Sequence, residues 1–282
     1  MKIIECPRDA MQGLDNFIPT ADKAKYISAL MKVGFHTIDF GSFVSPKAIP
    51  QMKDTAEVLE LLDFEGAKSR LLAIVANFRG AQDAMEFDEI AYIGFPLSIS
   101  ETFQQRNTNK SIDDALEEVK QMKYLSGRYN RELVVYLSMG FGNPYDEPYS
   151  PAIVAEFVGK LAELEIDIVS LADTIGVAKP ELITSLFTEL IPAYPDIEFG
   201  AHLHSTPATA YEKVKAAYEA GCRRIDTAMG GMGGCPMAKE DLTGNLATET
   251  LVEYLKSIDS LPNLDMKALE KAAAMRLELI SA

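Results

Sequence analysis

The sequence contains only three histidines, and two of them, His202 and His204, are separated by a single residue. They fall in the segment 197–205 (IEFGAHLHS), whose apolar pattern predicts a β-strand. Residues i and i+2 of a strand face the same side, so the two imidazoles can point at a common divalent metal ion. Taken alone, the HxH pattern fits equally well a hydrogen-bonded core histidine next to a surface histidine. Polar residues elsewhere in the chain favour the metal site.

A carboxylate, an amide and a guanidinium accompany the two imidazoles. Asp9 follows the first predicted strand, and Asn245 follows a glycine-rich segment and is predicted to open the next helix. Imidazole nitrogens together with carboxylate, amide oxygen and water favour Mg²⁺ or Mn²⁺ over a closed structural zinc site. The same ligands are also compatible with Zn²⁺. Arg8 beside Asp9 is by default a surface ion pair, but Pro7 and the strand before it weaken that interpretation. A guanidinium there can hold a carboxylate or stabilise a developing enolate, while Asp9 binds metal or moves a proton.

The segment 231–245 (GMGGCPMAKEDLTGN) places Cys235 among four glycines and a proline. Glycine permits backbone conformations that other residues avoid, so this segment can form a tight or moving loop that carries the thiol. On this segment alone, a surface turn with an incidental thiol is the simpler interpretation.

Eight short β-rich segments alternate with amphipathic helical segments along the chain. Near-continuous apolar strands separated by helices indicate a parallel sheet covered by helices. Eight repeats suit a closed α/β architecture, the (β/α)8 TIM barrel, and a doubly wound open sheet is the alternative. No linker interrupts the alternation, so we predict a single domain over residues 1–282, with an additional C-terminal helix from the segment 264–280. The strands are predicted at residues 2–6, 36–42, 70–77, 89–98, 132–141, 166–174, 197–205 and 223–229.

In a TIM barrel the loops after the strands converge on one mouth, where catalytic groups gather. Polar residues follow most of the predicted strands and therefore share this mouth. Asp173 in LADTIG either reacts or has a structural role, orienting Arg8 or capping a loop. Four cations are candidates for phosphate contacts at the rim, with solvated surface charges as the default interpretation: Lys47, Arg79, Arg106 and Lys110. The polar residues at the mouth are Arg8, Asp9, Asp39, Ser42, Asn77, Asp173, Thr174, His202, His204 and Asn245.

Composition excludes several classes of function. The formal net charge of −15 repels phosphate backbones, so we expect neither nucleic acid nor an anionic membrane as a partner. Three cysteines without a pairing motif indicate reduced thiols and an intracellular compartment. The N-terminal segment lacks the long apolar core of a signal peptide, and no apolar run reaches membrane-spanning length. We therefore expect a soluble cytoplasmic protein.

Five motifs occur in an order that resembles the 3-hydroxy-3-methylglutaryl-CoA (HMG-CoA) lyase family of DRE-TIM metallolyases. They extend over nearly the whole chain, and the combination of SFVSPK, GGMGGCP and GNLATE is quite specific. The motifs are PRDAMQ (7–12), SFVSPKAIPQM (42–52), LADTIGVAKP (171–180), HLH (202–204) and the segment 230–252 from GGMGGCP to GNLATETLV.

The resemblance implies a TIM barrel that binds a divalent cation and cleaves an acyl-CoA substrate to acetyl-CoA and acetoacetate. Arg8 would be the catalytic cation, His202 the acid or base nearest the reacting carbon, and Cys235 a mobile-loop thiol that relays a proton or excludes water. A homodimer is implied by the resemblance as well. The implied metal ligands are Asp9, His202, His204 and Asn245, with Asp9 also among the catalytic groups, and the substrate-binding residues are Asp39, Asn77 and Glu249.

Three departures from the family pattern bear on the substrate. The first motif lacks both of the family's glycines, the segment 205–208 lacks an aspartate after HLH, and Asp39 stands where glutamate is usual. These changes allow a lyase that acts on a related 3-hydroxyacyl-CoA. Two further alternatives are a Claisen-condensing acyltransferase of the same superfamily and a non-catalytic metal-binding scaffold. The short chain after the barrel disfavours the first, and the presence of Arg8 and Cys235 disfavours the second.

Overall fold

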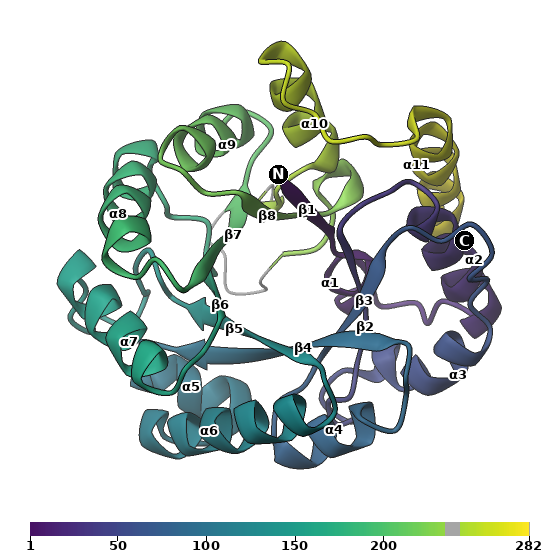
Figure 1. The fold of residues 1–282 in the computed structure, drawn as a ribbon. Coiled ribbons are helices and arrows are strands. Elements are labelled where there is room, and N and C mark those ends of the chain that lie inside the picture. Colours follow the sequence, from purple (N-terminus) through teal and green to yellow (C-terminus); the bar gives the residue numbers. More distant parts are fainter. Residues whose placement is uncertain (235–242, 282) are drawn as a thin grey trace.

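The computed structural model describes residues 1–234 and 243–281, and it shows a closed barrel of eight parallel strands surrounded by helices (Figure 1). Each strand pairs with its sequence neighbour, and β8 returns to pair with β1. The predicted TIM barrel is therefore confirmed, and the open sheet is wrong. The barrel strands are β1 (Lys2–Glu5), β2 (Thr37–Ser42), β3 (Arg70–Ile74), β4 (Ile90–Ser98), β5 (Glu132–Ser138), β6 (Ile168–Asp173), β7 (Glu198–Ser205) and β8 (Arg224–Thr227).

Helices cover the outside of the barrel, and the predicted C-terminal helix, α11, packs beside α2 (Figure 1). Within residues 1–234 and 243–281, no helix combines the length and the apolar character needed to cross a membrane. The helices are α1 (Pro7–Gln12), α2 (Thr20–Met31), α3 (Thr55–Glu60), α4 (Phe78–Ala84), α5 (Glu101–Thr108), α6 (Ile112–Arg128), α7 (Pro151–Glu163), α8 (Pro180–Ala193), α9 (Ala210–Glu219), α10 (Thr248–Ser257) and α11 (Met266–Ser281), with short 3-10 turns η1 (Pro50–Met52) and η2 (Met229–Gly231).

The core has two parts because strand side chains alternate between the barrel interior and the helices. The larger apolar cluster lies between strands and helices and includes Met31 and Met122. A smaller cluster fills the interior around Leu72, Tyr136 and Ile168. The interior is therefore a packed layer that supports the mouth from below.

Two local features differ from the sequence prediction. The strand predicted at 132–141 ends at Ser138, because Met139 has a positive φ of 59° that no strand can continue. Asn245 does not open a helix. It lies in a two-residue strand, β9 (Gly244–Asn245), which pairs antiparallel with β7, and α10 begins at Thr248.

Candidate metal site

Asp9, His202 and His204 meet at the carboxyl end of the barrel, as the sequence predicted. One ligand atom from each of the three side chains lies within 4.8 Å of the other two. The histidines come from β7, whereas Asp9 comes from α1, a short helix directly after β1 with Pro7 at its first position. Proline is favoured at that position because its fixed φ suits the first helical turn. The early helix therefore turns Asp9 back over the mouth.

His204 presents one ring nitrogen to the site. Its Nδ1 lies 3.1 Å from the carbonyl oxygen of Thr174, which only accepts, so Nδ1 carries the proton. Its Nε2 is buried and has no hydrogen-bond partner in the described part of the chain. Burial and the neighbouring His202 lower the pKa of His204 to about 4, which keeps the ring neutral. A neutral imidazole with a buried, unpartnered nitrogen fits a metal ligand.

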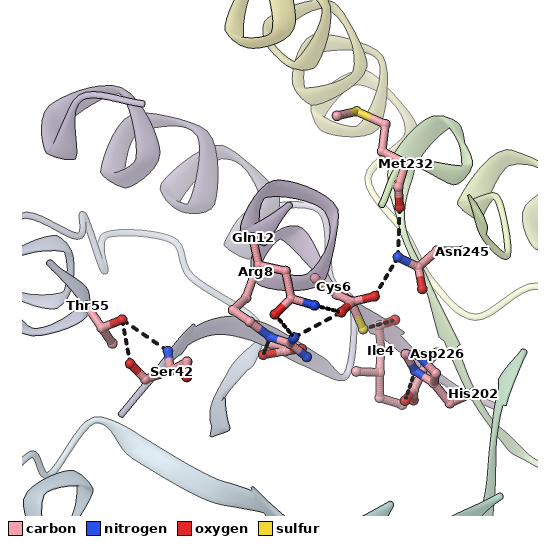
Figure 2. Close-up of polar contacts among 12 residues, drawn as sticks. Ile4, Cys6, Arg8, Gln12, Ser42, Thr55, His202, Asp226, Met232 and Asn245 are labelled. Atoms are coloured by element: carbon pink, nitrogen blue, oxygen red, sulfur yellow. Dashed lines mark hydrogen bonds and ion pairs between the residues drawn. The ribbon is translucent and has the colours of Figure 1, made fainter. Parts of the chain in front are cut away.

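His202 is oriented by a carboxylate on the adjacent strand. Its Nδ1 lies 3.1 Å from Oδ2 of Asp226, the residue paired with it in the β7–β8 register (Figure 2). Burial opposes the charged form of His202, but the hydrogen bond and the charge of Asp226 raise its pKa overall. Engagement of Nδ1 leaves Nε2 as the nitrogen available to an ion. Asp226 was not predicted from the sequence.

Asn245 lies next to Asp9 because β9 pairs it with His204. Its amide nitrogen donates to Oδ2 of Asp9 and to the carbonyl oxygen of Met232, both at 2.7 Å (Figure 2). Both contacts use nitrogen, which leaves the amide oxygen as the atom that could face an ion. The four predicted ligands are thus brought together, and their donor set fits Mg²⁺ or Mn²⁺.

Arg8 holds two carboxylates at once. Its Nε and Nη2 donate to Asp39, with a shortest distance of 2.6 Å, and its Nη1 donates to Asp9 and Gln12 at 2.9 Å (Figure 2). Burial disfavours the Asp9 carboxylate, but the Arg8 charge and the imidazoles lower its pKa to about 2. Burial raises the pKa of Asp39 to about 6 against the opposing effect of Arg8. The guanidinium of Arg8 thus donates to Asp39 and Asp9, and Gln12, which the sequence did not single out, is its third acceptor.

A cavity of about 430 Å³ opens above these residues. Its floor includes Arg8, Asp9, His202 and His204, and one wall is apolar. The Arg8 guanidinium meets the carboxylates of Asp9 and Asp39 here, and a bound divalent cation would offset the negative charge that the carboxylates leave. The apolar lining includes Val44, Ala48, Ile49, Ile74 and Phe103.

The remaining predicted residues lie elsewhere. Asn77 caps α4 by accepting the Gly80 N–H, and Glu249 accepts the Gly230 N–H. Neither is among the residues that line the cavity, so their predicted role in substrate binding stays a prediction. Cys235 lies outside the described residues, whereas the cysteines at 6 and 222 are buried free thiols.

Asp173 contacts a lysine and a loop N–H, and Arg8 bonds other side chains instead. Oδ2 of Asp173 pairs with Lys213 at 2.8 Å, and its Oδ1 accepts the Ala178 N–H, which caps the loop after β6. Lys213 is a buried lysine of α9 that the sequence did not single out.

The rim cations differ in their surroundings. Lys110 pairs with Glu118, and the Arg106 guanidinium lies 5.0 Å from the Tyr145 ring centre, whereas Lys47 and Arg79 are exposed.

Comparison with known proteins gives a consistent result. A family model described as HMGL-like matches residues 2–275. The chain is 34% identical over 278 residues to the mitochondrial hydroxymethylglutaryl-CoA lyase of Bos taurus, covering 97% of this chain and 84% of the relative. It superposes on the HMG-CoA lyase of Bacillus subtilis with a TM-score of 0.92 at 33% identity, covering 99% and 93% of the two chains. An HMG-CoA lyase from Acenitobacter baumannii, solved with coenzyme A and 3-methylmalate, gives 0.90 at 29% identity, covering 99% and 91%.

Proposed function

The chain belongs to the HMGL-like family, and from this we propose that it is a metal-dependent carbon–carbon lyase that cleaves HMG-CoA to acetyl-CoA and acetoacetate. The observation that supports this function best is the group formed by Asp9, His202 and His204, with the Arg8 guanidinium bonded to Asp9. A metal scaffold without chemistry would need no buried arginine at this point.

Asp9, His202, His204 and Asn245 would hold the divalent cation, with Mg²⁺ or Mn²⁺ as the candidates. When bound, the cation polarises the hydroxyl and carbonyl oxygens of the substrate. The unpartnered Nε2 of His204 and the ionised Asp9 supply the donors that such an ion requires.

In the cleavage, a base removes the proton of the C3 hydroxyl, the C2–C3 bond breaks, and the acetyl-CoA enolate is protonated. We assign stabilisation of the enolate oxygen to Arg8, and the contacts with Asp39 and Gln12, which fix the plane of its guanidinium, support this role. We assign proton transfer to His202: burial opposes its charged form, but the hydrogen bond and the charge of Asp226 raise its pKa overall, whereas the pKa of His204 falls to about 4. Because Asp226 engages Nδ1, Nε2 is the nitrogen of His202 that would serve metal ligation or proton transfer.

The apolar wall of the cavity supports one alternative substrate class. Val44, Ile49 and Phe103 could accept a 3-hydroxyacyl-CoA with a larger alkyl group at C3 than methyl. We further propose an acyl-CoA as the partner molecule, a homodimer and a loop role for Cys235 on the basis of the family resemblance, and a cytoplasmic location on the basis of the three cysteines without a pairing motif.

The test is a screen of 3-hydroxyacyl-CoA thioesters for carbon–carbon cleavage. The protein is first stripped with a chelator and then assayed with and without added Mg²⁺ or Mn²⁺. We expect metal-dependent release of acetyl-CoA, with HMG-CoA cleaved at the highest kcat/KM. Absence of metal-dependent release from every thioester would contradict the proposed function, and preference for a longer chain would favour the alternative substrate.

A further inference from the structure

An arginine lies inside the barrel, below the metal ligands. Arg224 of β8 is 0% exposed, and none of its three guanidinium nitrogens has a hydrogen-bond partner among the described residues. The nearest carboxylate oxygen, from Glu198, is 3.6 Å away. A buried guanidinium with one long ion pair and no hydrogen bond is strongly unfavourable, so the surrounding interior must offset its cost.

The barrel interior is shaped to hold this side chain. Gly200 is the β7 partner of Arg224 in the register. A Cβ at Gly200 would lie 3.2 Å from Cδ of Arg224 and 3.0 Å from Oγ of Ser170, which is tighter than ordinary packing. The Tyr92 ring flanks the guanidinium at 5.6 Å. The glycine thus leaves the space that the arginine stem occupies.

Other buried polar atoms near Arg224 also lack partners in the described chain. They are Oε1 of Glu198, Oη of Tyr136, Oγ of Ser170 and Oδ1 of Asp226. The set contains both donors and acceptors, and the guanidinium already has the carboxylates of Asp226 and Glu198 nearby to balance its charge. Ordered water, which needs two to four polar partners, fits this set better than an anion would.

Asp226 connects this interior to the metal ligands. Arg224 and Asp226 are two residues apart on β8 and therefore face the same side. One oxygen of Asp226 lies 3.1 Å from Nδ1 of His202, and the other is the unpartnered Oδ1. A group that fixes Oδ1 therefore also fixes the oxygen that the imidazole contacts.

We propose that Arg224 is a positioning residue for His202. Water held between the Arg224 guanidinium and Asp226 orients the carboxylate of Asp226. That carboxylate holds the His202 proton on Nδ1 and so keeps Nε2 available to the metal ion. This inference rests on the proposed role of His202 as a ligand. It does not depend on which thioester is cleaved.

The test is nitrogen NMR of the metal-free protein labelled with ¹⁵N-histidine. With three histidines in the chain, His→Gln variants can assign every signal. At about pH 9, above the usual imidazole pKa of about 6.5, we expect His202 to carry its proton on Nδ1 in the wild type. Arg224→Met should shift it toward a mixture with the Nε2–H tautomer and weaken Mn²⁺ binding by about 10-fold, within the range typical of groups that orient metal ligands. Arg224→Lys, which keeps the charge, should restore most of the Nδ1–H signal.

Arg223→Met is the matched control, because the neighbouring arginine bonds to the carbonyl oxygens of Tyr218 and Cys222, away from the interior. It should change neither the tautomer nor Mn²⁺ affinity. If Arg224→Met does not fold, Gly200→Ala crowds the arginine stem and should cause a smaller shift in the same direction. An unchanged His202 tautomer in the folded variants would overturn the proposal, even if lyase activity fell. If the wild type cleaves none of the thioesters but Arg224→Met still shifts the His202 tautomer, the proposed function is overturned and the role of Arg224 stands.

Discussion

At the scale of single residues, Arg8 determines the electrostatics of the site. Its guanidinium bonds Asp39 on one edge and Asp9 with Gln12 on the other, which uses four of its five N–H donors and leaves one on Nη2. One cation between two carboxylates keeps Asp9 ionised and therefore ready to bind metal. The same rigid contacts keep the guanidinium in place while charge develops on a substrate oxygen.

Replacing Arg8 tests this role. Arg8→Gln should lower kcat by about 10²- to 10³-fold, the usual effect of removing a group that stabilises an oxyanion. Arg8→Lys keeps the charge and the fold, but a single ammonium cannot replace the fork, so kcat should remain low. Acetyl-CoA release gives the rate, and circular dichroism checks folding. The exposed Arg128→Gln, in the last turn of α6, serves as the control, and full activity in Arg8→Lys would contradict the argument.

The sequence predicted the residues of the site better than their contacts. The strand period placed His202 and His204 on one side, and the barrel prediction brought Asp9 to them. The pairing of Asp39 with Arg8, and of Asp173 with Lys213, could not be derived, because each joins side chains from elements distant in the chain. Arg224 and Asp226 could have been recognised from the sequence as interior residues, because two charged residues two positions apart stand in a strand expected to be apolar.

At the scale of elements, short segments position the ligands. The six-residue α1 and the two-residue β9 supply Asp9 and Asn245. Neither has enough residues to show a hydrophobic period, so both escaped prediction, whereas the eight barrel strands and the C-terminal helix were predicted correctly in number and order. A hydrophobic period can be detected only over several helical turns or strand alternations, so it gives no information on shorter segments.

The end of β1 is tied to the last part of the chain by a buried carboxyl. Glu5 accepts hydrogen bonds from the Met229 N–H at 2.8 Å and the Thr248 hydroxyl at 2.5 Å. Burial raises its pKa from 4.5 to about 8. Between these values the folded protein retains a proton that the unfolded chain has released, so the free energy of unfolding should fall as pH rises from about 4.5 to about 8.

Glu5→Gln removes this titration and should flatten the pH dependence of stability over that range, with a gain relative to the wild type at the alkaline end. Urea unfolding at several pH values provides the measurement. The exposed Glu57→Gln is the control and should leave the slope unchanged. An unaltered slope in Glu5→Gln would show that the carboxyl is not the group responsible.

At the scale of the whole molecule, the predicted metal ligands come from the first and the last parts of the chain. Asp9 follows the first strand, whereas His202, His204 and Asn245 belong to the last third of the chain. An ion bound by all four would crosslink these parts in the folded state only. Such an ion stabilises the native state by mass action, by about 2.7 kcal/mol at 100 times its Kd.

Addition of Mn²⁺ to the stripped protein should therefore raise Tm by several degrees, since each kcal/mol corresponds to about 2–4 °C in chains of comparable size. Calorimetry with a Mn²⁺ titration gives the shift. His204→Gln should remove most of it while leaving the metal-free Tm close to that of the wild type. An equal shift in His204→Gln would place the stabilising ion elsewhere.

The antiparallel pairing of β9 with β7 has a consequence for biosynthesis. A growing chain exposes Asp9 almost at once, but Asn245 can reach His204 only after the ribosome has released most of the polypeptide and β9 has added to β7. We therefore expect nascent chains to bind Mn²⁺ weakly until that late stage. Tight binding of the ion then indicates that the barrel is complete.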